Sequence, residues 1–90
     1  MQKPYLIRTQ LGIHVRPAKQ IVQTAAAFEC KVLLEKNGKQ YNAKSLVSVL
    51  SVGAKFGDTV TVITEGNGEA EALQAVGAIL ESVSEESHSS

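Results

Sequence analysis

The sequence predicts a single α+β domain of two layers, in which helices cover one face of an antiparallel sheet. The 90 residues are 43% hydrophobic and 20% charged, which is typical of one globular domain with a core of its own. Apolar residues recur at helical spacing in some segments and alternate with polar residues in shorter ones. The pair Asn37-Gly38, the strongest short hairpin signal, joins two of the short segments, so these strands are antiparallel.

Four short strands are expected. The first covers Tyr5-Leu6-Ile7-Arg8-Thr9, with Tyr5 and Ile7 on one face. Pro4 favours an edge position for it, because proline has no N–H to donate to a second neighbour. Cys30 is expected in the middle of the second strand, as a small buried apolar residue. The second, third and fourth strands are expected at residues 30–35, 39–43 and 59–64, and in the fourth Val60 and Val62 face the core.

Three helices complete the order βα–ββ–αβ–α. The first is expected to start at Pro17, which is tolerated in a first turn, and to end near Ala27. Because the residue before a proline disfavours the α region, Arg16 is expected to be extended. Ser45 is expected to cap a short second helix that Gly53 closes. The last helix carries the apolar stripe Ala72, Leu73, Val76, Ile79, Leu80 and Val83, and the polar tail at residues 84–90 is expected to fray.

Charge is unevenly distributed along the chain although the net charge is zero. Residues 1–57 hold all nine Lys and Arg and two acidic residues, a net charge of +7, whereas residues 58–90 carry −7. A basic half suits acidic partners and phosphate, although charges on solvated faces explain most of the lysines individually. The four aromatic residues form no stacking motif for RNA, so no nucleic-acid partner is expected.

The cysteine, histidine and hydropathy patterns exclude several classes of protein and of functional site. A lone cysteine forms no internal disulfide, residues 1–10 do not resemble a signal peptide, and no apolar run approaches a membrane span. We therefore expect a cytoplasmic protein without membrane insertion. Two widely separated histidines and one cysteine offer no metal-ligand spacing, and no Gly-rich phosphate loop or catalytic triad is present.

The segment Gly12-Ile13-His14-Val15-Arg16-Pro17-Ala18 is the candidate site. His14 precedes a helix start, where free backbone N–H groups and the positive end of the helix dipole attract anions. The dipole and Arg16 both favour a neutral, nucleophilic imidazole, and they would stabilise a phosphoryl group bound to it. The alternative is a histidine that only caps the helix or packs over Pro17.

This segment resembles the active-site signature of HPr, the histidine-containing phosphocarrier of the phosphoenolpyruvate:sugar phosphotransferase system. Asn37-Gly38-Lys39, Ala43-Lys44-Ser45-Leu46 and Gly53 also fall where HPr sequences carry their hairpin, their second helix and its end. The resemblance covers about residues 3–83. It implies an open-faced β-sandwich with four antiparallel strands in the order 1-4-2-3 and three helices on one face.

The resemblance also implies a function. His14 would accept a phosphoryl group on Nδ1 from phospho-enzyme I and pass it to sugar-specific IIA domains, with Arg16 stabilising the phosphate. The supporting residues of the loop and helix start are Gly12, Val15, Pro17 and Ala18. Such a carrier needs no cofactor and no small-molecule pocket of its own, and we expect a monomer. Val15 is bulkier than the residue that many HPr proteins have there, so a small effect on rate is expected.

Two further features concern regulation and docking. In many HPr proteins the serine matching Ser45 is phosphorylated by HPr kinase/phosphorylase, which places charge beside the contact surface and can alter binding to a catabolite-control transcription factor. An alternative function is therefore a mainly regulatory HPr-like protein of carbon or nitrogen control. The second helix has more apolar residues than one face can bury, unless the whole helix is buried. The expected partner surface is formed by Lys19, Gln20, Leu46, Val47 and Leu50.

Overall fold

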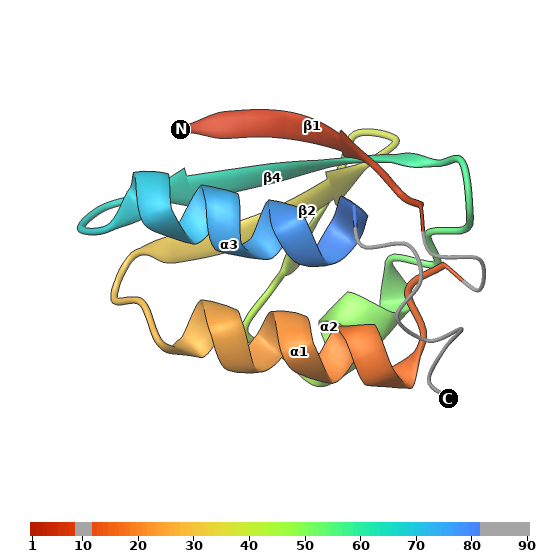
Figure 1. Cartoon of the computed structure of the whole chain (residues 1–90), viewed down its shortest axis with the longest axis horizontal. Helices are drawn as coiled ribbons and strands as arrows, with labels where there is room; N and C mark the ends of the chain where they lie inside the picture. The colour runs from red at the N-terminus through yellow and green to blue at the C-terminus, as the bar shows by residue number, and fades with distance from the viewer. Residues whose placement is uncertain (9–11, 82–90) are drawn as a thin grey trace.

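A computed structural model describes residues 1–8 and 12–81 of the chain. Strands and helices follow one another in the predicted order (Figure 1). The strands are β1 (Gln2–Leu6), β2 (Lys31–Lys36), β3 (Lys39–Asn42) and β4 (Thr59–Glu65), and the helices are α1 (Val15–Ala26), α2 (Leu46–Ser51) and α3 (Glu69–Glu81).

The four strands form one antiparallel sheet in the order β1-β4-β2-β3. All three helices lie on the same side of this sheet (Figure 1). The open-faced β-sandwich and its strand order are therefore confirmed. β1 is an edge strand that pairs only with β4, and Pro4 lies there opposite Thr61, as its missing N–H requires.

The predicted bounds of the first strand were wrong. β1 begins at Gln2 and ends at Leu6, while Thr9 lies outside the described residues. Ile7 is buried on the same face as Tyr5, but its backbone bonds to the loop before β4 instead of the strand itself. Its N–H donates to the Asp58 carbonyl over 2.8 Å, and its carbonyl accepts the Gly57 N–H over 2.9 Å. The alternation of apolar and polar residues cannot by itself distinguish a segment that pairs with a loop from a β-strand.

The core lies between the sheet and the helices. Val60 and Val62 point into it, as predicted. Cys30 is buried too, but it precedes β2 by one residue instead of lying in mid-strand. Four residues of the predicted stripe of α3 are buried and Ile79 is half-buried, whereas Val83 and the tail lie outside the described residues.

Gly77 in α3 lets β1 and the helix approach closely. A Cβ at Gly77 would lie 2.1 Å from Cζ of Tyr5, so the aromatic ring occupies the place of a side chain. The Tyr5 hydroxyl donates to the Leu73 carbonyl on the same helix over 3.3 Å. The ring therefore packs the edge strand onto α3.

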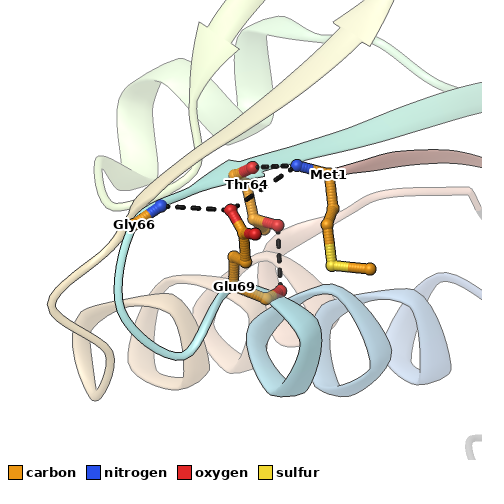
Figure 2. A network of polar contacts seen from close by, with 4 residues as sticks. All are labelled: Met1, Thr64, Gly66 and Glu69. Carbon is orange, nitrogen blue, oxygen red and sulfur yellow. Dashed lines mark hydrogen bonds and ion pairs between the residues drawn. The ribbon is translucent and has the colours of Figure 1, made fainter.

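A polar network ties together the start of β1, the end of β4 and the start of α3 (Figure 2). The Met1 ammonium donates to the Thr64 carbonyl over 2.6 Å and lies 3.7 Å from Oε1 of Glu69. Oε1 also accepts the Gly66 N–H over 3.2 Å. The buried Thr64 hydroxyl donates to the Glu69 carbonyl over 2.9 Å. This network lies at the end of the molecule opposite the start of α1 (Figure 1).

Candidate functional site at the start of the first helix

His14 is the N-cap residue of α1. Its backbone is extended, and its carbonyl accepts the Ala18 N–H over 2.9 Å. The imidazole makes no capping hydrogen bond, and His14 is half-buried and lines an open depression. The ring is therefore not used to cap the helix, in contrast to the alternative in which His14 serves only as a cap.

Arg16 is helical, so the prediction of an extended Arg16 was wrong. The helix starts at Val15, and Pro17 occupies the third helical position instead of the first. Proline is tolerated there because the N–H groups of the first turn have no intrahelical acceptor. A proline disfavours the α conformation of the residue before it, but this is only a preference, and Arg16 is helical in spite of it.

The helical Arg16 changes which N–H groups can face an anion. Free N–H groups at the helix start were expected to attract an anion, but Pro17 has no N–H and the Ala18 N–H donates to the His14 carbonyl. Lys19 lies far enough into the helix for its N–H to pair with the Val15 carbonyl. The first-turn N–H groups of Val15 and Arg16 are thus the candidates for binding a phosphoryl group beside His14.

Gly12 and Ile13, the two residues before His14, contact a distant part of the chain. Gly12 has φ +72°, in the left-handed region, and a Cβ there would lie 2.3 Å from the carbonyl oxygen of Ala54. The Ile13 N–H donates to the same oxygen over 3.0 Å. Gly12 signals a close approach in the sequence, but nothing in the sequence identifies Ala54 as its partner.

His14 opens onto a shallow depression at the start of α1. Two cationic side chains, Arg16 and Lys19, line it and are exposed. Within the described residues, neither has a hydrogen bond or an acidic partner, so both charges are available to an incoming anion. The depression is lined by His14, Val15, Arg16, Lys19, Gln20 and Gln23.

A smaller groove continues from the depression toward α2. It is mainly apolar and is lined by Lys19, Val22, Gln23 and Leu46, so Lys19 borders both hollows. On α2, Val49 is fully buried, whereas Val47 is 74% exposed and Leu46 and Leu50 are each 37% exposed. The short helix therefore leaves an apolar face uncovered, as predicted, and it is not buried on all sides.

Ser45 caps α2 as predicted. Its backbone is extended, and its Oγ accepts the Ser48 N–H over 3.4 Å. Gly53 follows the helix with φ +65°, as expected for the residue that ends it. The cap explains a serine at this position without any further role.

In the described residues, no helix combines the length and the apolar character that a membrane crossing needs. Residues 1–8 and 12–81 contain no group of three or more His, Cys, Asp or Glu placed to hold a metal ion. The chemistry that the site offers is that of one imidazole, nearby cations and helix N–H groups.

Comparison with known proteins identifies the family. The family model described as the phosphorylation site of the HPr component of the phosphotransferase system matches residues 1–82. The HPr-like protein Crh of Halalkalibacterium halodurans is 40% identical over 81 residues, which cover 90% of this chain and 96% of that protein.

Solved structures agree with this assignment. A crystal structure of HPr from Bacillus anthracis is 36% identical with a TM-score of 0.85, over 89% of this chain and 95% of that one. A crystal structure of Bacillus subtilis Crh, described as a dimer with a swapping domain, is 38% identical with a TM-score of 0.73. The match covers 90% of this chain and 93% of Crh. From its fold, its sequence and its relatives, the chain belongs to the HPr family.

Proposed function

We propose that this protein is a phosphocarrier that accepts a phosphoryl group on His14 from phospho-enzyme I and passes it to IIA domains. The observation that carries the proposal is the placement of the His14 imidazole. It lies at the N-terminal end of α1, makes no capping hydrogen bond, and shares an open depression with Arg16. The N–P bond forms from the lone pair of Nδ1 as the bond between phosphorus and the donor breaks, and Nε2 keeps its proton.

The surroundings of His14 suit a carrier because they stabilise the phosphoryl group only modestly. A helix start contributes about 0.3–1 kcal/mol to binding of an anion. One charged hydrogen bond from Arg16 contributes about 1.5–3 kcal/mol. A deep pocket with several arginines would hold the phosphoryl group too firmly for onward transfer. Gly12, Val15, Pro17 and Ala18 shape the loop and helix start around this exchange.

Incubation with phosphoenolpyruvate and enzyme I tests the proposal. The wild type should acquire one phosphate that is labile in acid and stable in base, as expected for a phosphohistidine. His14→Ala should acquire none, and Arg16→Ala should be labelled more slowly. Equal labelling of His14→Ala would refute the site.

The docking of partners is part of the same proposal. Enzyme I and IIA domains would bind the exposed apolar face of α2 together with the depression at α1. The residues that we assign to this surface are Lys19, Gln20, Leu46, Val47 and Leu50. Acidic partner surfaces fit it, because the Lys19 ammonium is exposed and, within the described residues, has no acidic partner. We propose that the carrier acts as a cytoplasmic monomer.

A regulatory function is the second candidate, and the 40% identity with an HPr-like protein Crh favours it. In this case HPr kinase/phosphorylase would phosphorylate Ser45, and the product would bind a catabolite-control transcription factor. A nitrogen-control variant is a related form. The intact His14 argues against a purely regulatory protein, because such proteins can dispense with the histidine.

Treatment with ATP and HPr kinase separates the two functions. Labelling of the wild type but not of Ser45→Ala would support regulation at Ser45. Ser51→Ala is the matched control, since Ser51 is an exposed serine on the same helix. Labelling that persists in Ser45→Ala would exclude this site.

A further inference from the structure

The loop at residues 53–58, between α2 and β4, contacts the segment before His14. Gly12 packs directly against the backbone of Ala54 and Lys55, and the Ile13 N–H is bonded to the Ala54 carbonyl. Neither contact can adjust freely, because both partners are backbone. The loop therefore restrains the segment that leads into His14.

Asp58 gives the loop its shape. Its Oδ2 accepts the Lys55 N–H over 2.9 Å, while its own N–H donates to the Lys55 carbonyl over 2.9 Å. The Lys36 ammonium lies 3.4 Å from the same Oδ2 and donates to the Gly53 carbonyl over 3.4 Å. One carboxylate thus closes the turn, and one lysine of β2 connects both ends of the loop.

The loop is also attached to the chain that leads into the site. Ile7 and the loop exchange two backbone hydrogen bonds, through the Asp58 carbonyl and the Gly57 N–H. The hydrogen bond from the Lys55 N–H, with help from the Lys36 charge, lowers the pKa of Asp58 below its usual value. The folded loop therefore favours the ionised carboxylate form of Asp58.

We propose that Asp58 is a positioning residue for His14, acting through the turn at Lys55 and the Ala54 carbonyl on Gly12 and Ile13. Its carboxylate does not touch the phosphoryl group. The effect of Asp58 on phosphoryl transfer rests on the proposed phosphocarrier function, whereas the effect of Asp58 on the loop does not.

Glu69 offers a matched control at the other end of the molecule. Its carboxylate also accepts a backbone N–H three residues earlier, from Gly66, and also faces a cation, the Met1 ammonium (Figure 2). The two carboxylates make the same kinds of contact, but only Asp58 is connected to the segment before His14. A difference between their variants therefore reports on the connection and not on lost stability alone.

The test compares Asp58→Ala with Glu69→Ala at a temperature where both are fully folded. Asp58→Ala should lower the kcat of phosphoryl acceptance from enzyme I about tenfold, because the nucleophile is misplaced. KM should stay within about twofold, since the α2 surface is intact, and Glu69→Ala should change neither constant beyond about twofold. Asp58→Asn, which keeps an acceptor oxygen and the shape of the side chain, is the second variant and should lie between Asp58→Ala and the wild type.

Amide hydrogen exchange of Ile13, measured by NMR on the unphosphorylated protein, is independent of the proposed function. Exchange should be about tenfold faster in Asp58→Ala and unchanged in Glu69→Ala. If the wild type takes no phosphate but this contrast is present, the phosphocarrier function fails and the positioning of the loop stands. Equal kinetics of the Asp58→Ala and Glu69→Ala variants, or Ile13 exchange unaffected by Asp58→Ala, would overturn the proposal.

Discussion

Replacing Gly12 by alanine tests the packing behind His14 with a single methyl group. Gly12 has φ +72°, and the added Cβ would lie 2.3 Å from the carbonyl oxygen of Ala54 and 2.8 Å from Cα of Lys55. Both atoms are backbone, so no rotamer change relieves the overlap. The loop at residues 53–58 or the segment before His14 must move.

The expected loss of stability has two parts. A side chain in the left-handed region costs about 1–2 kcal/mol. Forcing an extra methyl group into a packed position costs about 1–3 kcal/mol more. The free energy of unfolding should therefore fall by about 2–5 kcal/mol. For a domain of this size, the melting temperature should fall by at least about 8 °C.

Gly38→Ala is the matched control, because Gly38 has φ +81° but a Cβ added there would meet nothing within 4 Å beyond its chain neighbours. It should show only the conformational part, about 1–2 kcal/mol. Urea unfolding followed by far-UV circular dichroism suits this chain, which has no tryptophan. If the two variants lose the same stability and Ile13 keeps its exchange rate in Gly12→Ala, the proposed packing against Ala54 is refuted.

Two further predictions concern the cap of α2 and the turn before β4. Ser45→Ala removes the acceptor of the Ser48 N–H and should lower the free energy of unfolding by about 0.5–2 kcal/mol. The control Ser51→Ala should change the free energy of unfolding little. Equal losses of stability in urea titrations of the two variants would contradict the capping role of Ser45. Because the pKa of Asp58 is lowered in the folded protein, its carboxylate stabilises the fold above the unfolded value of about 3.9, and this contribution is lost as the pH falls through the folded pKa. The difference in unfolding free energy between wild type and Asp58→Asn should thus be largest at neutral pH and shrink below about pH 4, and a difference that persists at about pH 2 would refute this role.

Local patterns in the sequence predict much of the fold because they encode local contacts. The hairpin follows from Asn37-Gly38, where both residues have positive φ. The second helix follows from the Ser45 cap and the Gly53 end, and the division of its apolar residues into a buried and an exposed face was confirmed. The strand order came from the resemblance, since alternation alone does not specify which strands are neighbours.

The features that the sequence did not predict depend on contacts between distant segments. Tyr5 fills the space above Gly77, and the Ala54 carbonyl fixes Gly12, but neither pair has a sequence signal. The start of α1 was misplaced because the steric bias before Pro17 is only a preference, and Arg16 is helical in spite of it. Sequence thus identified the residues of the candidate site, and the fold supplied the geometry and the loop behind it.

The most direct test of the account is NMR of the protein labelled with ¹⁵N in its histidine rings, before and after incubation with phosphoenolpyruvate and enzyme I. The phosphocarrier proposal predicts that Nδ1 of His14 becomes coupled to phosphorus, and that adding a IIA domain reverses this change. A phosphoryl group on another residue, or one on His14 that no IIA domain can remove, would contradict it.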